Sequence, residues 1–377
     1  MSLHYRSLFP EIKQRIKSEC VRETPSDTEQ LLSLPYPYIV PAARERDALF
    51  YWDTYFINMG ILRMGMIEHA RHNVENLVYL QRRFGHVPAS NRKDAAGHSH
   101  PPMLPWMVRD IYRATGDKEW LRRVVPDLLA EFKFWTKDPH TSVTGLYRYT
   151  RVEGDGAECE SGWAGSPRFS NITAINPVDL NALLYRNAQI IHDLQIEVDG
   201  QGDESLIKRS KKIADLMDLC WDSDQSFYFD NDFEEKSLTP VRSLAGYLPL
   251  FVELVDQERA ESMQKQLKNF VASGGVVCMS PMDQKSALPW SYPLSYAPYV
   301  YYLVKGLIDY EMMEDAADIG TNWLNMVREI HKTSGEFWEW YNAVDPSNKA
   351  ADGTPNRPLL GWTAGVFIAL TDALGLD

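Results

Sequence analysis

The sequence has few cysteines, and they are not grouped. Four occur in 377 residues, at Cys20, Cys159, Cys220 and Cys278, and no two of them have C-x-x-C spacing. Neither a disulfide framework nor a zinc ribbon is indicated, because both need paired or closely spaced cysteines. We therefore expect reduced thiols and a cytoplasmic protein.

Long apolar runs and positive charge are also scarce. No apolar run reaches the length that spans a bilayer, and the first 19 residues lack the apolar stretch of a signal peptide. With 39 basic and 52 acidic residues, the formal net charge is -13. This charge repels nucleic acid and anionic membrane surfaces but not a neutral sugar. We expect neither a nucleic acid nor a membrane as partner; the sequence leaves the oligomeric state open.

No linker rich in Gly, Ser or Pro divides the chain, so we expect a single domain over residues 1–377, with residues 1–45 as an N-terminal extension. Strand patterns are few, and amphipathic stretches of helical period dominate. The expected helices cover residues 12–20, a segment beginning near 51, then 68–84, 102–114, 118–135 with Asp117 as N-cap, 177–192, 205–219, 242–254, 257–271, 296–310, 313–331 and 360–374. About a dozen helices spaced by roughly 30 residues fit an all-α, (α/α)6 toroid.

Aromatic residues are abundant, at 12% with 11 Trp and 19 Tyr. Core packing is the expected use of most of them, and the surplus suits a cleft that stacks on carbohydrate. Five segments beside expected helix ends also combine aromatic, carboxylate, amide and arginine side chains, which are the groups a sugar site needs. They cover residues 50–56, 85–102, 149–169, 289–298 and 335–363. In a toroid, all five could converge at one end of the central cavity.

Read in order, these segments resemble a clan of (α/α)6 glycoside hydrolases that contains the trehalases and the glucosidase-I-like enzymes. The matching blocks are Y-W-D-T-Y-F from Tyr51, G-H-V-P-x-x-N-R from Gly85, x-S-x-P-P from His98, E-S-G-W-x-x-S-P-R from Glu160, P-V-D-L-N-A from Pro177, E-W-Y from Glu339 and G-W-T-x-G from Gly361. The Ser-Pro-Arg tail ending at Arg168 is closer to the glucosidase-I-like branch, which includes hydrolases of glucosylglycerate and mannosylglycerate. The blocks from Pro177 and Gly361 are more similar to trehalases.

The resemblance implies hydrolysis with inversion, in which one carboxylic acid protonates the leaving oxygen and a second carboxylate activates a water. It places the base at Glu339 and the acid at position 164, where this sequence has Ala164. By the same match, the residues expected to bind the non-reducing glucose are Trp52, Asp53, Asn91, Arg92, Arg151 and Arg168, with Glu153 as a less close match. Trp163, Trp290 and Trp338 are expected to stack on the sugar. No cofactor or metal is implied.

Two blocks depart from the trehalase pattern on the leaving-group side. Residues 290–298 read W-S-Y-P-L-S-Y-A-P where trehalases tend to have W-D-x-P-N-G-W-A-P, which removes a carboxylate and an amide. Residues 98–102 read H-S-H-P-P in place of R-S-Q-P-P. The substrate is therefore expected to be a small α-glucoside, either trehalose or a solute similar to glucosylglycerate.

Three interpretations of Ala164 stay open. In the first, a catalytic Asp was replaced by engineering; in the second, the Asp was lost naturally; in the third, the match is shifted and Asp155, Glu158 or Glu160 is the acid. The intact Gly-Trp and Ser-Pro-Arg on either side favour the first. The leading hypothesis is an inverting α-glycosidase that is inactive in its present form; the alternatives are a sugar epimerase or isomerase on the same toroid, and a non-catalytic sugar-binding protein.

Other polar groups have simpler expected roles. His98 and His100 lie two apart without a third ligand nearby, so they are a weak metal pair, and they are also the candidate bases of an epimerase. Asp179 falls in the first turn of an expected helix, where its charge complements the helix dipole, so we expect a structural role. The acidic cluster at 230–235 is expected in a solvated loop, with a calcium site as the alternative, because hard cations need several converging oxygens.

Overall fold

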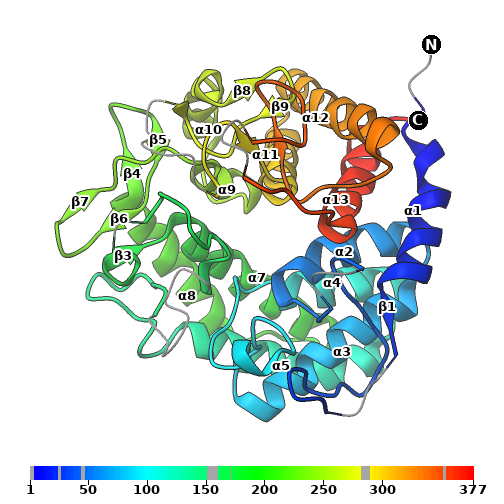
Figure 1. Cartoon of the computed structure of the whole chain (residues 1–377). Helices are drawn as coiled ribbons and strands as arrows, with labels where there is room; N and C mark the ends of the chain where they lie inside the picture. Colours follow the sequence, from blue (N-terminus) through cyan, green and yellow to red (C-terminus); the bar gives the residue numbers. More distant parts are fainter. Residues whose placement is uncertain are drawn as a thin grey trace.

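Helices form two concentric rings around one axis, as the computed structural model shows (Figure 1). It describes residues 4–23, 27–43, 47–150, 160–169, 171–281, 289–350 and 354–377. Strands are two residues long and lie in the connections between helices. The all-α, (α/α)6 toroid predicted from helical periodicity is confirmed.

Six helices form the inner ring, and their packing closes a circle. In order they are α2 (Tyr51–Arg63), α4 (Leu104–Thr115), α7 (Val178–Asp199), α9 (Leu248–Phe251), α11 (Ala297–Asp309) and α13 (Leu360–Ala373). Each packs against the next, and α13 packs back against α2. Residues on almost every side of α2, α11 and α13 are buried, as expected for helices enclosed both by the centre of the ring and by an outer layer.

The outer ring consists of helices with one buried side. They are α1 (Phe9–Arg15), α3 (Ile67–Phe84), α5 (Lys118–Trp135), α8 (Glu204–Leu216), α10 (Gln257–Gln264) and α12 (Met313–Ser334) (Figure 1). Asp117 caps α5 as predicted, because its carboxylate accepts a hydrogen bond from the Trp120 amide at 2.9 Å. None of the described helices is long and apolar enough to cross a membrane.

Short antiparallel strands tie neighbouring connections together. The pairs are β1 (Val21–Arg22) with β2 (Tyr38–Ile39), β4 (Trp221–Asp222) with β5 (Phe227–Tyr228), β8 (Val271–Ala272) with β9 (Gly275–Val276), and β6 (Asn231–Asp232) with both β3 (Ile175–Asn176) and β7 (Ser237–Leu238). The pair of β10 (Leu294–Ser295) with β11 (Tyr341–Asn342) matters most for the site. It joins the segment before α11 to the segment that contains Glu339.

Three expected helices are shorter than predicted. The stretch 242–254 forms only a 3-10 turn, Leu244–Tyr247, and the four residues of α9, and Glu253 then leaves the helix with φ +55°. The stretch 257–271 ends as α10 at Gln264, because the residues after it form another 3-10 turn and the β8–β9 hairpin. The stretch 12–20 becomes a π-helix after Arg15.

The ring closes through two glycines. A Cβ on Gly60 of α2 would lie 2.6 Å from the Cα of Gly365 in α13, and a Cβ on Gly365 would lie 2.0 Å from the Phe56 carbonyl oxygen. Both distances are too short for any side chain, so the two backbones touch directly. This contact joins segments about 300 positions apart in the sequence.

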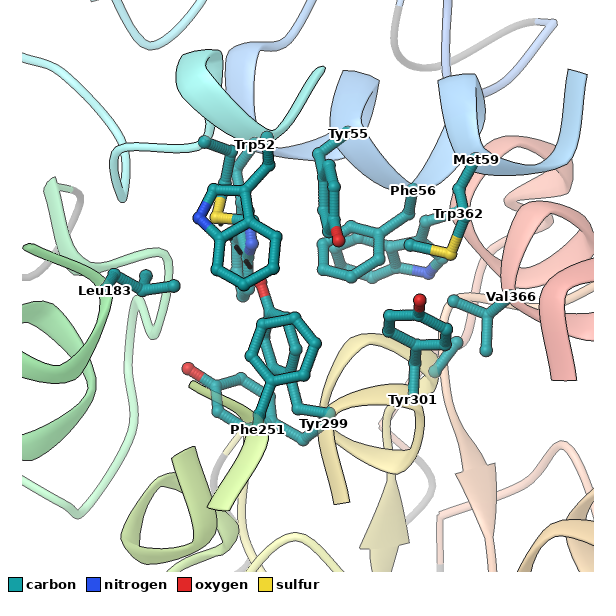
Figure 2. Close-up of a cluster of buried hydrophobic side chains, with 14 of the residues drawn as sticks. Trp52, Tyr55, Phe56, Met59, Leu183, Phe251, Tyr299, Tyr301, Trp362 and Val366 are labelled. Carbon is teal, nitrogen blue, oxygen red and sulfur yellow. Dashed lines mark hydrogen bonds between the residues drawn. The ribbon is translucent and has the colours of Figure 1, made fainter. Parts of the chain in front are cut away.

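Aromatic side chains fill the centre of the ring. Trp52 and Phe56 of α2, Phe251 of α9, Tyr299 of α11 and Trp362 of α13 point inward toward one another (Figure 2). Trp52 lies edge-on to Phe56, Tyr299 and Trp362 at centroid distances of 5.8 to 6.1 Å, a favourable aromatic geometry. Among the described residues, the centre of the toroid is therefore a packed core.

The three described cysteines are buried and free. Burial raises the pKa of the Cys20 thiol to about 12 and raises those of Cys220 and Cys278 further, so all three are unreactive thiols at neutral pH. Cys159 lies outside the described residues.

A buried carboxyl group connects the starts of α2 and α4 to α5. The side chain of Glu131, in α5, accepts a hydrogen bond from the Tyr51 hydroxyl, which itself accepts from the Met103 and Leu104 amides at 2.7 and 2.8 Å. The second Glu131 oxygen is buried without a hydrogen-bond partner among the described residues. Burial raises the pKa of Glu131 to about 8, so the group is neutral at pH 7.

We expect Glu131→Gln to remove a pH-dependent loss of stability. The pKa of Glu131 rises from 4.5 to about 8 on folding. Its contribution to stability is therefore complete below pH 4.5 and is lost as the pH rises to 8. At about 1.4 kcal/mol per pKa unit, the loss is at most about 5 kcal/mol. Urea unfolding at pH 5 and pH 8.5 measures it. The control is Glu119→Gln in the same helix, where the side chain is 79% exposed. If the free energy of unfolding declined equally with pH in the Glu131→Gln variant and in the unmodified chain, this prediction would be contradicted.

Candidate active site

All five segments singled out in the sequence meet at one cavity of about 550 Å³. Its lining residues are Phe50, Trp52, Asp53, Ala89, Arg92, Asp94, Ala95, His98, His100, Gly162, Ala164, Pro289, Trp290, Tyr296, Glu339, Trp340, Thr354, Pro355, Arg357 and Trp362. Of the residues predicted for the site, the structure thus brings together Trp52, Asp53, Arg92, Ala164, Trp290 and Glu339.

Four aromatic rings form one wall of the cavity. Trp290 stacks on Tyr296 with ring centroids 3.7 Å apart and on Trp52 at 5.9 Å. Trp362 lies edge-on to both tryptophans at 6.1 Å. The backbone amide of Trp290 also donates a hydrogen bond to the Tyr296 hydroxyl at 3.1 Å. A rigid apolar wall of this kind can lie against the C–H face of a sugar ring.

The loop 160–169 fits against this wall through one glycine. Gly162 has φ +75°, and a Cβ on it would lie 2.4 Å from the Trp52 ring. A side chain at position 162 would therefore displace the indole as well as strain the backbone. The next positions bring Ala164 to the cavity, where it is exposed.

The main chain around Glu339 is held by α13 and by the residues just before it, where Trp338 forms an isolated bridge with Pro358. The Leu359 amide donates to the Phe337 carbonyl at 2.8 Å, the Thr363 hydroxyl donates to the Trp338 carbonyl at 2.7 Å, and the Trp362 indole donates to the Glu339 carbonyl at 3.3 Å. These bonds fix the segment before and at the carboxylate. Glu339 is thus on a rigid support, as a catalytic group must be.

The Glu339 carboxylate forms an ion pair with one arginine. Arg357 Nε lies 2.9 Å from Glu339 Oε2, and the Glu339 amide donates to the Arg357 carbonyl at 3.0 Å. The Glu339 side chain is 13% exposed and that of Arg357 is 45% exposed. A carboxylate placed this way, at the edge of a cavity, can remove a proton from water.

A second carboxylate on the rim is held in its charged form. Arg92 donates to Asp94 through Nε at 2.9 Å and through Nη2 at 2.5 Å. This hydrogen bonding holds the pKa of Asp94 below its usual range. Asp94 is therefore a poor proton donor at neutral pH.

Formal charges in the lining nearly cancel. Asp53, Asp94 and Glu339 contribute -3 and Arg92 and Arg357 contribute +2, which gives -1 with neutral histidines. Each arginine already pairs with a carboxylate. The cavity is suited to a neutral ligand rather than an anion.

Four predicted site residues lie outside the lining. The Asn91 amide group is fully buried, accepts from the Leu49 amide at 2.8 Å and donates to the Leu32 carbonyl at 3.0 Å, so it ties its loop to two earlier segments of the chain. Trp163 is buried behind Trp290 at 5.1 Å. The half-buried Trp338 indole donates to Ser334, outside the cavity. Two further predicted site residues, Arg151 and Glu153, lie outside the described residues.

Arg168, the fourth predicted site residue outside the cavity lining, is buried in an ion-pair cluster. Its guanidinium binds Asp179 and Asp230, and all three side chains are at most 3% exposed. Asp179 thus has the structural role expected of it. The prediction of a solvated loop for the acidic cluster at 230–235 is wrong for Asp230, whose charge Arg168 compensates inside the protein, and for Asp232, which is buried and accepts from the Glu234 and Glu235 amides; Glu234 and Glu235 are exposed.

Glu160 is turned away from the cavity. One of its carboxylate oxygens lies 3.2 Å from His140 Nε2, the other accepts from the Thr150 amide at 2.7 Å, and the side chain is 1% exposed. It therefore does not take the place of an acid at position 164. Asp155 and Glu158, the other two candidates, lie outside the described residues.

His98 and His100 both line the cavity, with ring centroids 6.3 Å apart. They are neighbours on one side of it. An epimerase needs two bases that face each other across the ligand, and these two histidines do not. The described residues contain no group of three or more His, Cys, Asp or Glu that could hold a metal ion.

Sequence reasoning missed Asp94, Trp340 and Arg357 as lining residues. Trp340 belongs to a matched block and could have been found there. Arg357 reaches Glu339 only because the loop after β11 returns to form a bridge between Trp338 and Pro358. No local pattern in the sequence signals that return.

Comparison with known sequences agrees with this geometry over nearly the whole chain. A family model described as trehalase matches residues 2–162 and 159–375. A probable trehalase of Oryza sativa subsp. japonica is 26% identical over 449 residues, covering 99% of this chain and 78% of the relative. A periplasmic trehalase of Pseudomonas aeruginosa is 27% identical over 444 residues, covering 100% and 77%.

Solved structures share the fold. The neutral trehalase from Saccharomyces cerevisiae aligns with a TM-score of 0.81 at 20% identity, over 99% of this chain and 81% of that one. A mannosylglycerate hydrolase from Thermus thermophilus, in complex with glucose, aligns with a TM-score of 0.75 at 17% identity, over 96% and 99%. At these identities the likeness concerns the toroid itself.

Proposed function

The chain belongs to the trehalase family of glycoside hydrolases, and on that premise we propose that its cavity binds a small neutral α-glucoside, with trehalose as the first candidate. The relatives named trehalase support this choice of sugar. The lining supports a neutral ligand, because Arg92 and Arg357 are already paired. A glucosylglycerate-like solute has a carboxylate that would have to compete for one of these arginines.

The single observation that carries the proposal is that Glu339 and Ala164 line one cavity beside an aromatic wall. In the proposed reaction, Glu339 removes a proton from water, and the water oxygen attacks the anomeric carbon from the side opposite the leaving group. The glycosidic C–O bond breaks, the configuration inverts, and the leaving oxygen takes a proton from residue 164. Ala164 has no proton to give. The chain should therefore hold such a sugar without cleaving it.

A substrate whose leaving group needs no proton separates this proposal from the alternatives. We expect the unmodified chain to release fluoride from α-glucosyl fluoride, because fluoride departs as an anion while Glu339 activates the water. We expect the same chain to bind trehalose in calorimetry and to release glucose from it about 10² to 10⁴-fold more slowly than a chain with an acid at position 164. Fluoride release is followed with an ion-selective electrode, and α-mannosyl fluoride is the control sugar.

Two outcomes would contradict the proposal. Binding of trehalose without fluoride release would identify a non-catalytic sugar-binding protein, the alternative that Ala164 motivates. Binding of glucosylglycerate in preference to trehalose would show that the cavity selects an anionic aglycone and that the neutral-ligand proposal is wrong.

A further inference from the structure

A buried charged cluster lies directly behind the loop that carries Ala164. Arg168 donates to Asp230 through Nε and Nη2, both at 2.7 Å, and to Asp179 through Nη1 and Nη2, at 2.6 and 2.8 Å. The Tyr299 hydroxyl donates to Asp179 Oδ2 at 2.9 Å and accepts from the Trp163 indole. We call these five residues the Arg168 cluster.

Burying the charges of this cluster costs desolvation free energy. One guanidinium and two carboxylates leave a formal charge of -1 among side chains that are at most 3% exposed. Backbone amides of Val178 and Leu180 donate to the carboxylates at 2.9 Å and offset part of the desolvation. Apolar residues of similar volume can stabilise a core as well as a buried ion pair does. Packing alone therefore gives no reason for these charges.

The cluster holds the loop on both sides of position 164. Trp163 is fixed through its indole by Tyr299, with ring centroids 4.6 Å apart. Arg168 is fixed through its guanidinium, which lies 4.9 Å from the Trp163 ring centroid. Between them, the Ser166 amide donates to the Trp163 carbonyl at 3.0 Å and closes a tight turn. Ala164 itself is exposed to the cavity, so its position is set by these neighbours.

We propose that the Arg168 cluster is a positioning device that fixes residue 164 opposite Glu339 for proton donation. The inference rests on the proposed function, in which position 164 is the place of the acid. Arg168 and Tyr299 are positioning residues in this scheme, since neither lines the cavity. A displacement of about 1 Å in a catalytic group can cost about 100-fold in rate, which gives such a device its value.

The first test uses the unmodified position 164 and needs no activity. In Tyr299→Phe the ring stays while the link from Trp163 to Asp179 is lost. We expect amide hydrogen exchange in residues 163–168 to become about tenfold faster, since a lost buried hydrogen bond is worth about 1 kcal/mol or more. The control is Tyr247→Phe, another fully buried tyrosine whose hydroxyl bonds the Met263 carbonyl at 3.2 Å. Unchanged exchange in the loop would overturn the proposal.

The second test uses the Ala164→Asp chain and compares two substrates. Trehalose needs a proton on its leaving oxygen, and α-glucosyl fluoride does not. Adding Tyr299→Phe, or Arg168→Lys, which keeps a charge but loses the guanidinium fork, should lower kcat for trehalose by about 10- to 100-fold. Fluoride release should change less than about twofold, because Glu339 and the sugar-binding wall are untouched.

The outcomes separate the alternatives. Equal losses on both substrates would show a general structural role and overturn the proposal, and a rise in KM alone for both would show that Arg168 binds the sugar. If Ala164→Asp hydrolyses neither substrate, the proposed function fails, and the exchange measurement still decides whether the cluster holds the loop.

Discussion

Ala164→Asp is expected to turn the chain into an enzyme that releases glucose from trehalose, with kcat raised by about 10² to 10⁴-fold over the unmodified chain. Position 164 is exposed to the cavity that Glu339 also lines, so the new carboxyl enters an open site and its charge is not buried. The turn between Trp163 and Ser166 is already formed, and it needs no rearrangement to accept the side chain. Coupled detection of glucose measures the gain.

The matched control for this gain is Ala164→Asn. Asn has nearly the same shape as Asp but has no acidic proton to donate. Equal rates for the two variants would show that the new side chain acts by filling space, and the assignment of position 164 as the acid's place would then fail. Polarimetry on the active variant tests inversion, since inverting hydrolysis of trehalose releases one β-glucose and one α-glucose, whereas retention would release two α-glucose molecules.

Glu339→Gln is expected to reduce fluoride release by the unmodified chain, and glucose release by the Ala164→Asp chain, by about 10² to 10⁴-fold. The amide keeps the volume of the side chain and can still accept a hydrogen bond from Arg357, but it cannot take a proton from water. Binding of trehalose, measured by calorimetry, should change little. Loss of binding together with loss of rate would point to a role in holding the sugar.

Glu336→Gln controls for the charge change. Glu336 lies three positions earlier and pairs with Arg15 of α1 at 2.7 Å, outside the cavity that Glu339 lines. It should keep the fluoride-release rate of the unmodified chain. If both substitutions lower the rate equally, the segment has been disturbed as a whole and Glu339 has no special function.

Local sequence patterns predicted the elements of this fold well where one signal dominates. Helix α3 follows the apolar period and stops at Gly85, and α5 begins at the cap that Asp117 provides. The same patterns failed at α9 and α10, where short turns and a hairpin compete with helical propensity. Tertiary packing decides such cases, because a few residues of helix are worth little alone.

The cavity was predicted as a set of converging segments, and the structure brings those segments together. The direction of individual side chains could not be predicted. An arginine in a loop can face a ligand or the core, and Arg168 faces the core because Asp230, 62 positions away, lies there. Asn91 likewise hydrogen-bonds backbone groups of Leu49 and Leu32, 42 and 59 positions away. Such choices depend on partners distant in sequence, which a motif does not include.

The contact between Gly60 and Gly365 has a consequence for how the protein is made. Synthesis proceeds from the N-terminus, so α2 leaves the ribosome about 300 residues before α13, the helix that it must touch. Until α13 is made, the ring of helices is open. Trp52 then lacks Trp362, whose ring centroid lies 6.1 Å from its own in the folded protein. A nascent chain therefore has no complete aromatic wall, and no closed cavity beside it, at any stage before α13 has been made.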